Sequence, residues 1–284
     1  MRHTHILFTA LSLALLSSCG ELKLGKILDL LPSSQPTATA SPSPVATSTA
    51  TNPTAIPTTI PTAVPSAIAT PIVQTTPAPA GADVLLYLNM DEAPTGFLHK
   101  GQPVASKGIT TNSDGKFAQA WHFDGKGSYM KFFQDINPNA YPRLSMTTWA
   151  RYTGPNLHGP YQVISHDNSG FDRSLGIDYR GSKNLRAWSA FAGSAGVLGS
   201  SQPFIQNEWV FLAVVYDQVA KTTTLYVDGV SRTATNSVLG AGQTYLMIGS
   251  NPSFGEHFTG DLDDLRIYGR ALSAAEIESL RGAS

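Results

Sequence analysis

Three carboxylates stand within four positions near the C-terminus, in the stretch GDLDDLRIY from Gly260 to Tyr268. Asp261, Asp263 and Asp264 lie at the head of a run that otherwise has the apolar, β-branched character of a buried strand, where aspartate is uncommon. Like charges this close repel one another, and a half-buried carboxylate needs hydrogen-bond donors or a cation. The cluster is therefore expected to bind a ligand, to bind a structural metal or to do chemistry.

The spacing of the apolar residues in this stretch predicts a β-bulge. Leu265 and Ile267 alternate on one inward face, but the step from Leu262 to Leu265 is three residues, which is odd. A slip in the two-residue period is what a bulge produces, and a bulge re-aims the side chains beside it. One carboxylate of the pair Asp263 and Asp264 can then face a cation while the other caps a loop.

Calcium is the metal that suits these donors, because it takes six to eight hard oxygen ligands, carbonyl oxygens included. No EF-hand spacing supports it. The alternative is that the aspartates only accept backbone N–H bonds in turns.

Motifs for catalysis are missing from the sequence. There is no G-x-S-x-G elbow, no H-E-x-x-H helix and no Walker loop. Glycoside hydrolysis needs two carboxyl groups spaced across the bond, and the sequence suggests no such pair. His166 and Asp167 precede Asn168-Ser169-Gly170 and are explained better as part of a turn than as a catalytic dyad. The chain is therefore predicted not to be an enzyme.

The N-terminus has the pattern of an export signal. Residues 1–18 carry Arg2 and then an apolar run from Ile6 to Leu16, which is too short to span a bilayer. The run ends in LSSCG, which resembles the bacterial lipobox, and Cys19 is the only cysteine of the chain. We therefore expect Cys19 to be acylated, palmitate included, and the protein to be a membrane-tethered lipoprotein; an ordinary secretory signal with an incidental cysteine is the alternative.

Residues 19–81 are expected to connect this anchor to a folded domain. Residues 19–31 hold leucines at helical spacing with Lys23 and Lys26, which fits either a short interfacial helix or a disordered segment. Residues 32–81 contain no charged residue and consist mainly of Pro, Thr, Ser and Ala. Such a composition cannot build a core, so we predict a disordered stalk, extended by its prolines.

Residues 82–284 form the predicted globular domain. Short β-branched and aromatic runs recur there between Gly, Asn, Asp and Ser, which indicates an all-β sandwich or barrel. Asp228-Gly229 predicts a hairpin turn. Ser273 and Glu276 form a capping box for one short C-terminal helix. The domain carries 16 Lys and Arg against 18 Asp and Glu, so no charge excess favours nucleic acid as a partner.

Several sequence motifs, spread over nearly all of residues 82 to 280, resemble the motifs of a known protein family. The motifs are FDG at residues 123–125, LSMTTWAR, NEWVFLAVVYD, LYVDGV and, most specifically, FTGDLDDLRIYGRALSAAEIESL. Their order resembles that of laminin-G-like domains of the concanavalin A-like lectin/glucanase superfamily. The resemblance implies a jelly roll of two antiparallel sheets, glycan or protein ligands and one bound calcium.

Carried over position by position, the resemblance implies a calcium site made by Asp263, by Asp91 of the first strand and by Asp124 of the FDG turn. Carbonyl oxygens near Gly125 to Gly127 would complete it. Such a cation would tie the first strand to the last, and it would do no chemistry.

Aromatic residues are the candidates for ligand contact. Trp149 lies on a mostly polar strand face, where it is either a platform for a sugar ring or a packed side chain. Trp188 lies in the stretch NLRAWSAF, with Tyr179, Arg180 and Arg186 nearby, and these four residues are the predicted ligand contacts.

Together these features predict a monomeric binding module that is anchored by lipid at the cell envelope, on the outer membrane or the outer face of the plasma membrane. The domain would be extracytoplasmic and would recognise a glycan or an extracellular protein. The alternatives are an assembly role in the envelope without a soluble ligand and a glycan hydrolase. Specificity in this fold is set by loops without a readable code, so the sequence does not name the ligand.

Overall fold

The computed structural model describes residues 83–96, 98–100, 102–155, 157–180 and 185–283. The expectations for the signal segment, Cys19, residues 19–31 and the stalk lie outside the described residues. No helix within those five ranges is long and apolar enough to cross a membrane.

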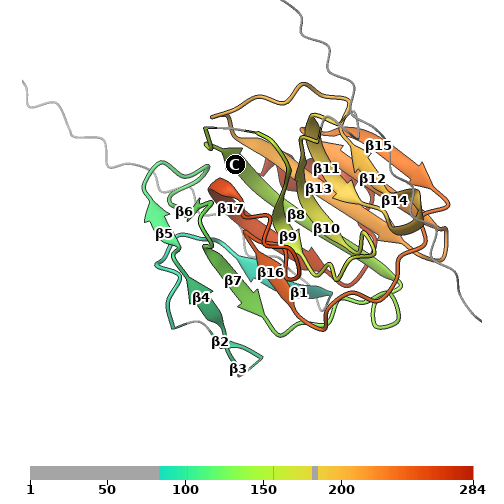
Figure 1. Ribbon diagram of the computed structural model, residues 1–284, viewed down its shortest axis with the longest axis horizontal. Helices are drawn as coiled ribbons and strands as arrows, with labels where there is room; N and C mark the ends of the chain where they lie inside the picture. The colour runs from blue at the N-terminus through green and yellow to red at the C-terminus, as the bar shows by residue number, and fades with distance from the viewer. Residues whose placement is uncertain (1–82, 97, 101, 156, 181–184, 284) are drawn as a thin grey trace, which may run out of the picture. The chain divides into compact units, whose positions relative to one another are not determined.

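Two antiparallel sheets form the fold, which confirms the predicted all-β jelly-roll sandwich with one C-terminal helix (Figure 1). The eight-stranded sheet has the order β15-β14-β13-β8-β17-β6-β5, with β1 paired to β17 beside β6. Its strands are β1 (Val84–Leu88), β5 (Thr110–Asn112), β6 (Ala120–Asp124), β8 (Arg143–Tyr152), β13 (Val210–Asp217), β14 (Thr222–Val227), β15 (Val230–Thr235) and β17 (Thr259–Tyr268).

The seven-stranded sheet has the order β12-β11-β10-β9-β16-β7-β4. Its strands are β4 (Ala105–Lys107), β7 (Tyr129–Phe132), β9 (Pro160–Ser165), β10 (Ser174–Asp178), β11 (Ala187–Phe191), β12 (Val197–Gly199) and β16 (Leu246–Ile248). A two-stranded hairpin of β2 (Leu98–His99) and β3 (Gln102–Pro103), a 3-10 turn η2 (Gly193–Ala195) and the helix α1 (Ala274–Gly282) complete the described elements.

The main core lies between the two sheets, where strand residues of alternating position meet. Trp121, Phe123, Met146, Ile177 and Leu262 are all fully buried there. This alternation is the one expected when each sheet turns one face inward.

The outer faces of the two sheets differ. The outer face of the eight-stranded sheet has a second apolar cluster, in which Trp149 and Phe211 pack with Leu272 and Ile277 at the start of α1. Trp149 is only 6% exposed, so it is a packed side chain and not an open sugar platform. The helix begins at the predicted capping box, in which the Ser273 side chain accepts from the Glu276 N–H. The outer face of the seven-stranded sheet has no covering helix among the described elements.

The last strand, β17, confirms the predicted bulge and pairs with the first strand. Its register with β8 shifts between Asp263 and Arg266, and Asp264 has a φ of 50°, the left-handed region that a bulge residue can adopt. The first strand, β1, pairs with the second half of β17, from Val84 opposite Tyr268 to Leu88 opposite Leu265. In Figure 1 these two strands stand at opposite ends of the colour range and yet belong to one sheet.

Candidate functional site

Asp263 has the environment of a cation ligand or of a protonated acid. It is fully buried, its Oδ2 accepts from the Phe117 N–H at 3.0 Å, and its Oδ1 has no hydrogen-bond partner within the described part of the chain. Burial, together with the charges of Asp264 and Asp91, raises the pKa of the Asp263 carboxyl to about 7. A charged oxygen left unpaired in the protein interior is costly, so a proton or a metal ion is required there.

Asp91 lies near Asp263, since its charge acts on that carboxyl. Its Oδ1 accepts from the Gln119 N–H at 3.1 Å, so Asp91 and Asp263 hold the same loop, which runs from Phe117 to Gln119. Its charge also contributes to raising the pKa of the Asp264 carboxyl to about 6, although burial is the main cause of that shift. These two carboxylates fit one hard cation that would also use carbonyl oxygens.

Asp124 does not belong to this pair, which corrects the predicted ligand set. Asp124 pairs with Thr259 in the sheet, whereas Leu262, next to Asp263, pairs with Trp121. Four residues along a strand correspond to about 13 Å, which is too far for a shared cation. The described residues hold no group of three or more His, Cys, Asp or Glu arranged for a metal ion. The family pattern led to Asp124, but the register of β6 against β17 decides the distance.

The Asp124 carboxylate instead organises its own turn. Its Oδ1 accepts from the Lys126 N–H at 2.8 Å and from the Ser128 N–H at 3.3 Å. The Lys126 backbone bond is the main reason that the pKa of Asp124 lies below its usual value. For this aspartate the alternative interpretation, a turn carboxylate, is the right one.

Asp261 and Asp264 are each paired with arginine. Asp261 accepts from Arg151 Nε at 3.0 Å and lies 2.8 Å from His122 Nδ1. Asp264 lies 2.9 Å from Arg266 Nη2, and both side chains are buried. The three aspartates of the opening cluster therefore have separate partners.

Of the four predicted ligand contacts, Arg180 lines a surface hollow. Trp188 is 1% exposed and packs at 5.2 Å from Phe204, inside the core. It is therefore not the exposed contact that was predicted. Tyr179 packs against the same Phe204 at 5.9 Å. Arg186 is exposed and lies over the Tyr179 ring at 5.8 Å.

The Arg180 hollow lies among the loops and strand ends around β9, β10 and β11 and has a volume of about 210 Å³. Its lining comes from the β9–β10 loop, the end of β10, the end of β11 and the loop after β16. The lining residues are Asp167, Ser169, Phe171, Arg180, Phe191, Phe254 and Glu256. We call this cavity the sheet hollow.

The two carboxylates of the sheet hollow, those of Asp167 and Glu256, accept hydrogen bonds mainly from uncharged donors. The Asn251 amide nitrogen donates both to Asp167 Oδ2 at 3.1 Å and to Glu256 Oε2 at 2.9 Å. Gln162 adds a bond to Glu256 Oε2 at 3.1 Å. Burial is the main cause of the raised pKa of Glu256, and the charge of Asp167 adds to it. Amide donors can fix a carboxylate without neutralising it, so its charge stays available to polar ligand groups.

Asp167 is mainly a structural acceptor. Its Oδ1 accepts from the Ser169 N–H at 3.3 Å and from the Asp172 N–H at 3.1 Å, and Ser253 Oγ donates to its carbonyl at 2.9 Å. These bonds tie the β9–β10 loop to the loop after β16. They confirm that His166 and Asp167 belong to a turn.

Phenylalanines give the sheet hollow its apolar surface. Phe254 is 57% exposed at the tip of the loop after β16. Phe171 has a φ of 54° and contacts Phe191 edge-on at 5.4 Å, so the turn holds one ring against the end of β11. Carboxylates, an arginine and aromatic rings around one hollow can bind a ligand that has both hydroxyl groups and apolar faces.

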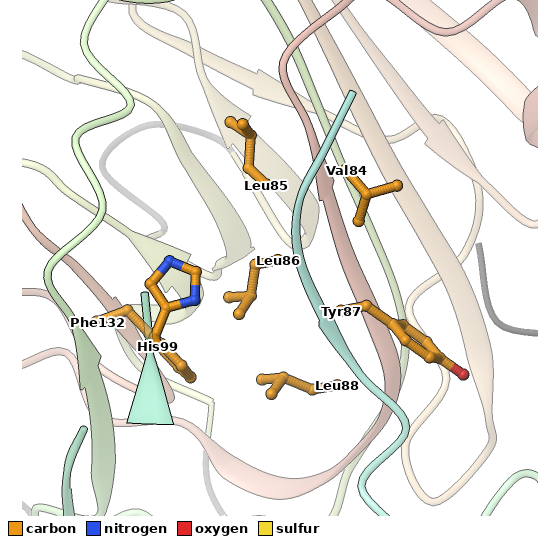
Figure 2. Close-up of a pocket in the computed structure, with 7 residues that line it drawn as sticks. All are labelled: Val84, Leu85, Leu86, Tyr87, Leu88, His99 and Phe132. Carbon is orange, nitrogen blue, oxygen red and sulfur yellow. The ribbon is translucent and has the colours of Figure 1, made fainter. Parts of the chain in front are cut away.

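A second hollow lies beside β1 and has a volume of about 190 Å³. In Figure 2, Leu86 and Leu88 point toward His99 and Phe132, whereas Tyr87 points away on the other side of the strand. His99 Nε2 lies 3.2 Å from Gln134 Oε1. Aliphatic core side chains dominate this lining, and no carboxylate is part of it, so it is a poorer candidate for a polar ligand.

Sequence reasoning missed Phe171, Phe191, Phe254 and Glu256. The only local signal was the turn Asn168-Ser169-Gly170 together with NPSFGE before the last strand, two loops rich in turn residues that each carry a phenylalanine. Nothing local to either stretch tells that the two loops meet over β9 and β10.

The chain belongs to the concanavalin A-like lectin/glucanase superfamily, because the model of its laminin-G-type family matches residues 124–278, more than half of the chain. Similar solved structures share the fold at low identity. Domain 4 of AbnA, a GH43 extracellular arabinanase from Geobacillus stearothermophilus solved in complex with arabinotriose, is 18% identical with a TM-score of 0.51, over 71% of this chain and 98% of that one.

Two toxin structures are also similar. The binding domain of Paraclostridial Mosquitocidal Protein 1 is 14% identical with a TM-score of 0.52, over 70% of this chain and 52% of that one. A botulinum neurotoxin type C structure, whose report concerns cell entry through two ganglioside molecules, is 13% identical with a TM-score of 0.50, over 70% and 50%. The chain thus spans about half the length of these toxin domains. None of the curated proteins matches it.

The buried His166, next to Asp167, predicts a pH dependence of stability. Burial lowers its pKa from 6.5 to about 4, and the charge of Arg173 adds to the lowering, whereas the contact of Nδ1 with the Gln243 carbonyl at 3.2 Å acts in the opposite direction. Because the folded pKa lies below the unfolded one, this contribution is complete above pH 6.5 and is lost between pH 6.5 and 4. The loss is about 3 kcal/mol.

We expect His166→Gln to have a flatter dependence of unfolding free energy on pH over this window than the wild type, measured by urea denaturation. The difference between the two proteins is the informative quantity, because the raised pKa values of Asp263 and Asp264 act with the opposite sign, adding stability as the pH falls. Parallel curves for the two proteins would contradict the assignment.

Proposed function

We propose that this chain is a membrane-tethered, extracytoplasmic binding module that recognises a glycan through the sheet hollow. The observation that carries the proposal is the combination of exposed Phe254, Arg180 and the amide-held Glu256 around one cavity. Sugars present hydroxyl groups to polar side chains and C–H faces to aromatic rings, so this mixed lining suits them.

The relatives support this choice of ligand class. The arabinanase domain was solved with arabinotriose, and the report of the type C neurotoxin names gangliosides. Both are sugar ligands held by proteins of this fold. At such low identities the likeness concerns the fold, so the ligand of this chain rests on its own hollow.

Binding is favoured over hydrolysis by the state of Asp167. A glycosidase needs one carboxylate that is free to act as nucleophile or base. Asp167 instead accepts bonds on both oxygens, two of them from backbone N–H groups of its own turn. Release of product from any polysaccharide would overturn this part of the proposal.

The first test is a glycan-array screen of the purified protein, followed by titration of the best glycan into Phe254→Ala. We expect that variant to lose at least about tenfold in affinity, because truncating a central exposed aromatic contact typically costs more than 1 kcal/mol. Val219→Ala is the matched control, since Val219 is 66% exposed after β13 and outside the hollow. Equal affinities of both variants and the wild type would exclude the hollow.

We also propose that Asp91 and Asp263 hold one calcium ion that stabilises the junction of β1, β17 and the loop from Phe117 to Gln119. What supports it is the unpartnered, buried Asp263 Oδ1 near a second carboxylate. When bound, the ion would supply positive charge and would keep both groups ionised; it would have no part in chemistry.

This proposal predicts that chelation lowers the melting temperature and that calcium restores it. At a concentration about a hundredfold above the dissociation constant, a cation that binds only the native state adds about 2.7 kcal/mol. Asp263→Asn should melt at one temperature with or without calcium, whereas Asp124→Asn, outside the pair, should keep the response. If chelation leaves the melting temperature of the wild type unchanged, the proposed calcium site is wrong.

The membrane anchor remains a proposal from the sequence. Acylation of Cys19 would place the domain outside the cytoplasm at the envelope, with residues 32–81 as spacer. We expect the wild type to incorporate labelled palmitate and to sediment with membranes, and Cys19→Ser to do neither. A labelled Cys19→Ser protein, or an unlabelled wild type, would be the contrary result.

A further inference from the structure

A second aromatic surface lies on the outer side of the seven-stranded sheet, near the sheet hollow. Phe133 is 59% exposed, which makes it, with Phe254, one of two phenylalanines among the large exposed apolar residues in the described ranges. Its ring lies 6.5 Å from that of Tyr245, edge-on. Lys131 Nζ lies 3.6 Å from the centre of the Tyr245 ring and 5.1 Å from that of Phe133. We call these three residues the aromatic platform.

Register places the platform on the outer face. Leu246 and Phe132 are core residues that pair with each other across β16 and β7, so their neighbours Tyr245 and Phe133 point the other way by strand alternation. Lys131 pairs with Met247, two positions from Tyr245, and is on that same outer face. The Lys131 ammonium group lies within cation–π distance of both rings, so this attraction stabilises their positions.

The platform is continuous with the sheet hollow. Met247 of β16 pairs with Ser165 of β9 on one side and with Lys131 of β7 on the other. The chain before β16 follows the end of β9, since the Gln243 N–H donates to the His166 carbonyl at 2.7 Å. Tyr245 therefore stands next to the segment that carries Asp167, a lining residue of the hollow.

The span of the combined surface sets the size of the ligand. From β10, which lies under the hollow, to β7, which carries the platform, the sheet crosses three strand-to-strand steps, by way of β9 and β16. At about 4.8 Å per step this is roughly 14 Å. A single sugar ring does not cover that length.

We propose that the aromatic platform is a second subsite, and that the ligand is an oligosaccharide of three or more residues that lies across the strands. One end occupies the sheet hollow at Phe254, and a later residue stacks on Phe133 and Tyr245. This inference rests on the proposed glycan-binding function and adds to it the length and direction of the ligand. Isolated exposed phenylalanines are ordinary, but a ring pair fixed by a cation and aligned with a polar hollow is what a chain-shaped ligand requires.

The test is calorimetric titration of the purified protein with arabino-, xylo- and gluco-oligosaccharides, each from two to six residues long. For the series that binds, we expect the wild-type affinity to rise by about tenfold between two and four residues. Phe133→Ala should remove this rise and leave the affinity for the two-residue ligand unchanged. Phe254→Ala should weaken binding at every length, and Val219→Ala should match the wild type.

The outcomes separate the two proposals. If Phe254→Ala weakens binding and Phe133→Ala follows the wild type at every length, the platform is not a subsite, although the hollow still binds the glycan. If none of the three series binds to a protein whose circular dichroism spectrum is that of a β-sandwich, and the glycan array is also blank, both proposals are wrong. Tyr245→Phe, which keeps the ring, should behave as the wild type, whereas Tyr245→Ala should resemble Phe133→Ala.

Discussion

Placement of the last strand at the centre of a sheet is the constraint on which this domain depends. β17 pairs with β8 along one edge and with β6 and then β1 along the other, so the eight-stranded sheet is not complete until the final strand is in place. Non-local pairing of this kind is characteristic of slowly folding all-β proteins. It also brings acidic residues into a dry region, where Asp261 and Asp264 take arginine partners and Asp263 keeps one oxygen without a hydrogen bond among the described residues.

The bulge on β17 reconciles this burial with the apolar pattern of the strand. A left-handed residue at Asp264 lets Leu262 and Leu265 both reach the core in spite of their odd spacing. The carboxylates of this stretch then contact four different groups. Asp263 accepts from the Phe117 N–H, Asp261 pairs with Arg151, and Asp264 contacts Arg266 and Tyr87. The same distortion that satisfies the apolar residues therefore accompanies the buried Asp263, which is one of the two carboxylates proposed to hold a cation.

Much of the fold followed from local patterns, and the sites did so only in part. The bulge could be predicted from the step between Leu262 and Leu265, the helix start from Ser273 and Glu276, and the sandwich from the recurring strands. Asp124 was assigned to the wrong cluster. The FDG motif identifies this residue in the sequence, but the register of β6 against β17 decides how far it lies from Asp263. Trp188 was taken for a surface residue although it alternates with Ala190 toward the core in β11. The loops that carry Phe171 and Phe254 meet only through tertiary contacts, which no local pattern encodes.

The two outer faces of the sandwich have become different for a physical reason. On the eight-stranded sheet, apolar residues such as Trp149 and Phe211 need cover, and α1 with Leu272 before it supplies that cover. On the seven-stranded sheet, the outward positions near the middle are small or polar, as at Ser165, Ser174 and Gly176, and no helix is needed there. Loops alone rise above this face and leave hollows between them. Phe133 and Phe254 are exposed and are not part of the core, so both rings stay available for contact with a ligand.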